Sequence, residues 1–154
     1  MKGQFKFRME AVLTLRTQQE QIVQKELSAL QKELDEAFNV LKSLDKERLS
    51  VEQELTDTQR KSHVATRLVE HLQYLDLLKK KIAYSQDDVI KLQNKIASKR
   101  QKLFEAKKNK EVLEKLKEKH YSDWKNHIDK IESQFLDELA TIRFHRQDSG
   151  LKYD

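Results

Sequence analysis

The stretch LSALQKELDEAFNVLKSLDKERLSVEQEL, residues 27–55, decides the fold of this chain. Its apolar side chains recur every seven residues in two interleaved series, the a positions Leu27, Leu34, Leu41 and Leu55 and the d positions Leu30, Ala37, Leu44 and Val51. Such a heptad repeat is typical of α-helices that wind round one another in a coiled coil. No glycine or proline interrupts residues 4–149, so nothing in that stretch favours a break in the helix.

A second heptad series begins at about Val64 and is out of phase with the first. Its a positions are Leu68, Leu75, Ile82, Val89, Ile96 and Leu103, and its d positions continue through Leu78, Leu92, Ala106 and Leu113. Between the two series the apolar stripe lapses, because the first register would place Thr58, Ser62 and Ala65 in the seam. This change of phase predicts that the chain reverses its direction there.

The sequence therefore predicts an all-α fold, a long antiparallel two-helix coiled-coil hairpin with a C-terminal helix overhang, as a single domain over residues 1–154. The expected elements are helix 1 at about 5–58, a turn at about 58–66, helix 2 at about 66–146 and a frayed tail at 147–154. The alternative is one continuous helix that dimerises in parallel. Charge favours the hairpin, because residues 17–57 carry a net charge of −5 and residues 66–106 a net charge of +4.

Because more residues follow the turn than precede it, helix 2 should extend beyond helix 1 from about His120. This overhang is rich in apolar side chains, namely Tyr121, Trp124, Ile128, Ile131, Phe135, Leu136, Leu139, Ile142 and Phe144. The N-terminal Phe5 and Phe7 should lie near residues 113–124, at the end opposite the turn. The aromatic residues that meet there form either a latch that closes the hairpin or a docking tip for another protein.

The sequence gives little support for catalysis, metal binding, nucleic-acid binding or insertion into a membrane. The chain has no cysteine, no glycine-rich phosphate loop and no His-Glu-x-x-His pattern, so we expect no catalytic residues, no metal site and no cofactor. The basic residues 91–120 carry a net charge of +7 and indicate a solvated coiled-coil surface, an acidic protein partner or a nucleic acid. No apolar run is long enough to span a membrane, and no secretory signal opens the chain, which favours a soluble cytoplasmic protein.

In the order of its motifs the chain resembles the FliJ family, small coiled-coil components of the flagellar type III export apparatus. The resemblance rests on Phe5-Lys6-Phe7, Val12-Leu13 with Arg16 and Glu20, Tyr74-Leu75 with Leu78 and Ile82, Lys115 with Lys119 and Tyr121, and Glu132 with Leu136-Asp137-Glu138-Leu139-Ala140 and Arg143. It covers nearly the whole chain. Virulence-type secretion systems have a similar stalk protein, and the sequence does not separate the two.

The resemblance implies a non-enzymatic stalk whose open end enters the pore of the hexameric export ATPase and promotes its assembly and activity. The implied ATPase-facing residues are Phe5, Phe7, Val12, Leu13, Arg16, Trp124, Ile131, Phe135, Leu139 and Arg143. Just after the turn the chain carries more apolar side chains than a two-stranded seam can cover, namely Tyr74, Leu77 and Leu78, which are either buried more widely against helix 1 or form a docking patch. The resemblance implies contact with an export-gate membrane protein, for which these three residues are the candidates, and escort of export chaperones. The implied location is cytoplasmic, at the periphery of the inner membrane beneath the flagellum.

Two other hypotheses stay open beside the export stalk. The first is a structural or tethering coiled coil that forms homodimers. The second is a nucleic-acid-associated protein that uses residues 91–120. None of the three requires a small-molecule substrate or insertion into a membrane.

Overall fold

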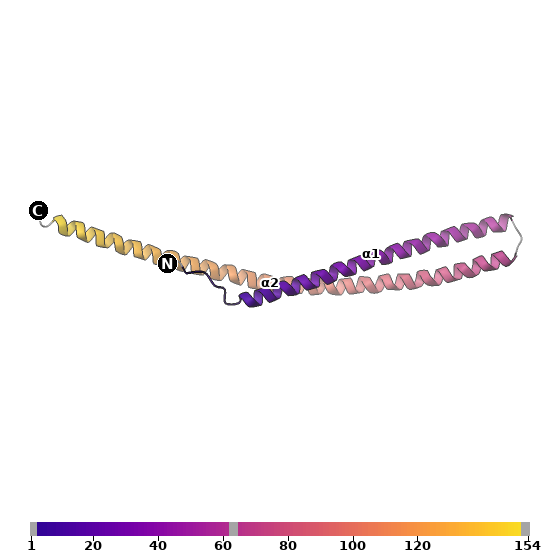
Figure 1. Ribbon diagram of the computed structural model, residues 1–154, viewed down its shortest axis with the longest axis horizontal. Coiled ribbons are helices and arrows are strands. Elements are labelled where there is room, and N and C mark those ends of the chain that lie inside the picture. The colour runs from indigo at the N-terminus through magenta and orange to yellow at the C-terminus, as the bar shows by residue number, and fades with distance from the viewer. Residues whose placement is uncertain (1–2, 62–64, 152–154) are drawn as a thin grey trace. The chain divides into compact units, whose positions relative to one another are not determined.

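A computed structural model describes residues 3–61 and 65–151 of the chain. It consists of two long helices, α1 (Glu10–Lys61) and α2 (Ala65–Leu151), and no strand occurs within those residues. The helices pack against each other, which confirms the predicted all-α helical hairpin (Figure 1). The alternative prediction, one continuous helix that dimerises in parallel, is wrong, because the two helices pair within one chain.

The chain divides into two compact units, and both helices contribute to each. The hairpin unit comprises Gln19–Ala106, and the terminal unit comprises Met1–Gln18 with Lys107–Asp154. Each unit has its own apolar centre. In the hairpin unit Val51, Leu75 and Leu78 form a buried cluster that Leu44 and Leu55 border. In the terminal unit the centre is formed by Phe7, Leu13 and Leu113.

The heptad pattern describes the seam between the helices well. Every apolar a and d residue predicted from Leu13 to Leu113 is buried or half-buried, apart from Val64, which lies outside the described residues. The polar residues at seam positions are also partly covered, and Arg48 illustrates how this is tolerated. Its guanidinium bonds Asp45 at 2.8 Å and Glu52 at 2.9 Å on the same helix, so the charge remains paired at the edge of the seam.

Contacts between the helices fix their antiparallel register within the hairpin unit. Glu26 of α1 pairs with Lys99 of α2, and Tyr74 of α2 donates a hydrogen bond to Glu47 of α1. Near the turn, His71 Nε2 lies 3.5 Å from a carboxylate oxygen of Glu54. These pairs join the acidic arm to the basic arm as the charge pattern predicts. Each exposed pair contributes only about 0.2–1 kcal/mol, so the apolar seam supplies most of the stability.

The start of α1 differs from the prediction. We expected helix 1 to begin at about residue 5, but α1 begins at Glu10 and the segment 3–9 is not helical. Phe5 and Phe7 are two residues apart, which in a helix would turn their side chains about 200° away from each other. An extended segment places both side chains on the same side, where they pack with α2.

The other predicted helix ends also differ from those in the structure. α1 continues to Lys61 and α2 begins at Ala65, so residues 58–61 are helical and the predicted start of the turn at 58 is wrong. Ser62 and Val64 lie outside the described residues. At the other end α2 continues to Leu151 through Gly150, although we expected fraying from 147. A single glycine weakens a helix by only about 1 kcal/mol relative to alanine, and here it does not end one.

Candidate partner-binding site

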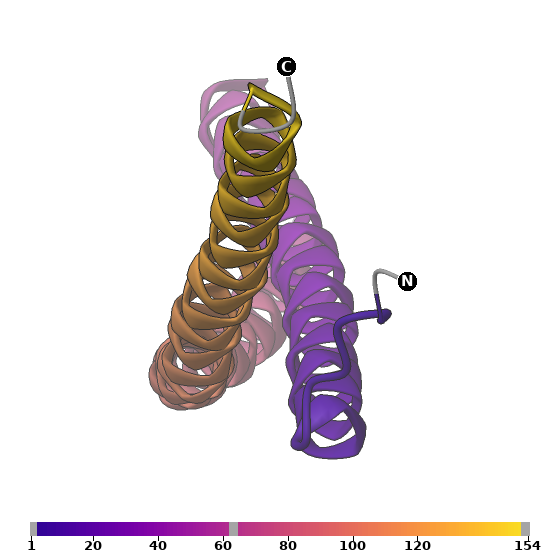
Figure 2. The ribbon, with the colours of Figure 1, turned by 90° about the vertical axis from the view of Figure 1, so that its left-hand side faces the viewer.

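The terminal unit begins with a short non-helical segment, residues 3–9, that leads into α1 (Figure 2). Two backbone hydrogen bonds close the entry to the helix, from Glu10 N to Phe7 O at 3.2 Å and from Leu13 N to Met9 O at 2.9 Å. Glu10 is the acidic residue in the first turn, where a carboxylate interacts favourably with the helix dipole. These contacts hold Phe7 and Leu13 against Leu113, and Leu116 borders the group.

Beyond this centre the N-terminal segment and residues 120–124 of α2 form an aromatic cluster. The ring of Phe5 lies 5.3 Å from Tyr121 in an edge-to-face arrangement and 5.8 Å from Trp124. The ring of Phe7 lies 5.8 Å from His120. Such ring pairs stabilise by about 0.5–1.5 kcal/mol beyond the area that they bury. The aromatic cluster therefore anchors the N-terminal segment to α2, as the predicted latch requires.

An ion pair reinforces this anchor. Lys117 Nζ lies 2.9 Å and 3.1 Å from the two carboxylate oxygens of Glu10. The pair also lines a shallow surface groove of about 470 Å³, together with Phe5, Lys6 and Phe7. The N-terminal segment contacts Tyr121, which stays 48% exposed, and the half-buried Trp124, so the overhang predicted from about His120 is partly covered at its start. The uncovered part begins only after the half-buried Ile128.

The C-terminal segment of α2, residues 129–150, is exposed at every position. Its apolar side chains lie on two faces of the helix that are separated by roughly 140° at 100° per residue. One face carries Ile131, Phe135, Leu139 and Ile142. The other carries Leu136, Ala140 and Phe144, and it adjoins the first at a shallow groove of about 430 Å³ that Leu139 also lines. A single partner helix covers one face of another helix, so a partner that surrounds this segment fits it better.

The structure separates the residues predicted to face an ATPase into two kinds. Phe7 and Leu13 are buried in the terminal unit, and Phe5, Arg16 and Trp124 are half-buried around them. The remaining residues are exposed, namely Val12, Ile131, Phe135, Leu139 and Arg143. The first group builds the latch and the second offers a surface. The second apolar face, with Leu136 and Phe144, was missing from the predicted site, although the i,i+4 spacing of Leu136, Ala140 and Phe144 indicates it.

The three residues predicted to face an export gate also divide. Leu78 is 1% exposed and belongs to the apolar centre of the hairpin unit, so the intact hairpin does not present it to a partner. For Leu78 the structure therefore agrees with burial against α1 and not with a docking patch. Leu77 is 47% exposed and Tyr74 is 39% exposed. The hydrogen bond to Glu47 raises the pKa of Tyr74 above its ordinary value of 10.0, because that bond requires the protonated hydroxyl.

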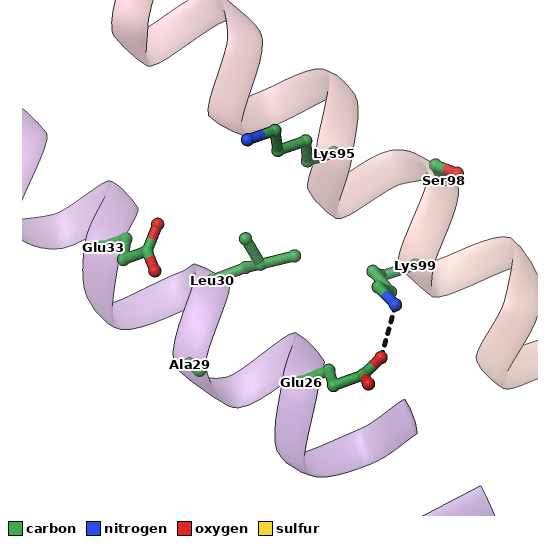
Figure 3. A pocket seen from close by; sticks show the side chains of 7 residues that line it. All are labelled: Glu26, Ala29, Leu30, Glu33, Lys95, Ser98 and Lys99. Carbon is green, nitrogen blue, oxygen red and sulfur yellow. Dashed lines mark hydrogen bonds and ion pairs between the residues drawn. The ribbon is translucent and has the colours of Figure 1, made fainter. Parts of the chain in front are cut away.

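On the surface of the hairpin unit an open groove of about 410 Å³ lies between the helices. Figure 3 shows Leu30 of α1 at its centre, with Glu26 bonded to Lys99 and with the small side chains of Ala29 and Ser98 at its margins. Within residues 3–61 and 65–151, no group of three His, Asp or Glu side chains is placed to hold a metal ion. No helix in that part of the chain is long and apolar enough to cross a membrane.

Comparison with protein families gives one match. The family model described as flagellar FliJ protein matches residues 5–149, which is nearly the whole chain. Comparison with curated proteins found no match, and neither did comparison with solved structures. The matched range includes both the aromatic cluster and nearly all of the exposed C-terminal segment.

Proposed function

The chain belongs to the FliJ family of flagellar export proteins, and from this premise we propose that it is the stalk of the export ATPase. In this proposal the end that carries both termini inserts into the hexameric ATPase ring and promotes ring assembly and ATP hydrolysis. The chain itself catalyses no reaction and needs no cofactor. It acts in the cytoplasm at the periphery of the inner membrane.

The exposed C-terminal segment carries the proposal. Residues 129–150 present apolar side chains on two faces, and such surface is normally covered by a partner. The interior of a protein ring can touch both faces of one helix at the same time. The aromatic cluster then has a supporting role, because it fixes the base of this segment against the start of α1.

Contacts with the export gate and with export chaperones are a second part of the proposal. Tyr74 and Leu77 remain candidates for the gate because both are exposed on the hairpin unit. If binding to the ring differs between its ATP and ADP states, the stalk shifts the populations of those states by the same difference in free energy. The hairpin unit would then present the gate-facing surface outside the ring.

Paired variants of exposed side chains test the proposed site. The double variant Phe135→Ala/Leu136→Ala removes one side chain from each face of the C-terminal segment. We expect the concentration that half-maximally stimulates the purified export ATPase to rise about tenfold or more, since central interface residues dominate binding energy. Helix content should stay unchanged, because Phe135 is 60% and Leu136 is 64% exposed.

The matched control is Phe104→Ala in the hairpin unit, where the ring is 64% exposed. This variant should stimulate the ATPase as the unaltered chain does. If Phe135→Ala/Leu136→Ala also stimulates normally, the C-terminal segment is not the ATPase-binding surface.

A further inference from the structure

One polar residue of the seam, His71, contacts an oxygen atom on each side of its ring. His71 lies near the start of α2 and is half-buried, one heptad before Leu78. Its Nδ1 atom lies 2.7 Å from the backbone carbonyl oxygen of Arg67, one turn earlier on the same helix. Its Nε2 atom lies 3.5 Å from a carboxylate oxygen of Glu54 on α1. The ring therefore joins the two helices of the hairpin unit.

The two neighbouring oxygens determine which ring nitrogens must carry a proton. A carbonyl oxygen only accepts hydrogen bonds, so the bond to Arg67 requires a proton on Nδ1. In a neutral imidazole Nε2 then holds a lone pair, which would face the lone pairs of the Glu54 carboxylate. In the imidazolium form both nitrogens carry protons, and Nε2 directs its proton towards Glu54. Both contacts are favourable together only when the ring is charged.

The other charges around the ring nearly cancel. The charged residues within seven positions of Glu54 on α1 and of His71 on α2, apart from these two, are Glu47, Arg48, Glu52, Asp57, Arg60, Lys61, Arg67, Glu70 and Asp76. They comprise five carboxylates and four cations. Several are engaged elsewhere, because Arg48 pairs with Glu52 on its own helix and Tyr74 donates a hydrogen bond to Glu47. Glu54, at ion-pair distance from the ring, is therefore the charge that distinguishes the two states of His71.

We propose that His71 is a proton-dependent clasp between the start of α2 and the end of α1. When the ring is protonated, its ion pair with Glu54 holds these helix ends together. When the ring loses a proton, this stabilisation is lost and the helix ends open more often. An imidazole changes its charge between about pH 5 and pH 8. Since the unfolded chain lacks the contact, the stabilisation is present at acid pH and is lost as the pH rises.

The clasp lies beside two residues that the proposed function assigns to the export gate. Tyr74 follows His71 by three residues and Leu77 follows it by six, so both lie within two helical turns of the ring. Opening of the clasp would loosen the part of α2 that carries them. The inference does not rest on the proposed function, because the clasp is a contact within one chain.

Hydrogen exchange of the full chain, measured at about pH 5.5 and at about pH 8, tests the clasp. At the acid pH we expect Glu54→Gln to speed the exchange of amides in residues 54–61 and 65–75 about two- to fivefold, the ratio that corresponds to an exposed ion pair. At the higher pH the same substitution should leave exchange unchanged. It should also have no effect at either pH in a chain that carries His71→Gln. Each comparison is made at one pH, so the intrinsic pH dependence of exchange cancels.

Glu26→Gln is the matched control, because Glu26 of α1 also pairs with a cation of α2, Lys99. Lysine remains charged throughout this pH range. The effect of Glu26→Gln on the exchange of amides near residues 26 and 99 should therefore be the same at both pH values.

Three outcomes would overturn the proposal. The first is that Glu54→Gln leaves exchange unchanged at the acid pH. The second is that it speeds exchange equally at both pH values, which would mean that the charge of His71 has no part in the contact. The third is that its effect at the acid pH persists undiminished in His71→Gln, since Glu54 would then act through another residue.

Discussion

Leu77 and Leu78 are neighbours of the same chemical type in very different surroundings. Leu78 occupies a d position and is 1% exposed, whereas Leu77 faces away from the seam and is 47% exposed. The heptad register separates them, because one residue turns the side chain by about 100°. Both had been candidates either for burial against helix 1 or for a docking patch, and the heptad register alone was sufficient to place Leu78 inside.

Substitution of each leucine measures this difference. Leu78→Ala should lower the free energy of unfolding by about 2–4 kcal/mol, because it leaves a cavity against Val51 and Leu75. Leu77→Ala should change it by less than about 0.5 kcal/mol, as exposed substitutions usually do. Urea unfolding followed by circular dichroism at 222 nm compares the two variants. Equal losses of stability would contradict the burial of Leu78.

Other single residues show the limit of sequence reasoning at the candidate site. The repeat identifies which side chains enter the seam, and Leu13 and Leu113 follow from it directly. It cannot show whether an aromatic residue outside the repeat is covered by its own chain. Phe7 is buried and Phe135 is exposed for this reason, although both had been assigned to the same partner surface.

The N-terminal segment is the element that the heptad pattern describes least well. Its residues 3–7 belong to no helix or strand and residues 8–9 form a turn, and Phe5 and Phe7 both pack inward at a spacing of two residues, whereas the helices pack by a seven-residue repeat. An extended chain advances about 3.3 Å per residue, about twice the rise of a helix. Phe5 of this segment contacts Tyr121 and Trp124, which had been expected to form part of the overhang.

The anchoring of this segment can be measured through Trp124, the only tryptophan of the chain. Phe5→Ala removes the ring contacts to Tyr121 and Trp124, each of which contributes about 0.5–1.5 kcal/mol. We expect the emission of Trp124 to shift to longer wavelength and acrylamide to quench it more strongly. Phe104→Ala, the control, should leave both signals unchanged. Unaltered emission in Phe5→Ala would show that Phe5 does not cover the indole.

The helices themselves were largely predictable, and their ends were not. The heptad series and the absence of proline and internal glycine give both helices and their antiparallel order. The ends depend on weaker, local effects. Gly150 lies within α2, and Thr58 remains half-buried in the first register, so α1 continues to Lys61.

Across the whole molecule, covered and exposed apolar residues have different roles. The seam residues stabilise each unit from within, and in the terminal unit the aromatic cluster adds to this. The C-terminal segment of the terminal unit remains exposed, and so do single apolar residues of the hairpin unit such as Ile90 and Phe104. Family membership indicates the flagellar export apparatus as the setting in which such surfaces would be covered.

The most direct test of the stalk proposal is a titration of the full chain into the purified hexameric export ATPase, with ATP hydrolysis and ring assembly followed together. The proposal predicts stimulation that saturates near one chain for every six ATPase subunits. Absence of both stimulation and co-elution, together with a mass twice that of the monomer in light scattering, would contradict it. That result would favour a coiled coil that forms homodimers and acts as a tether.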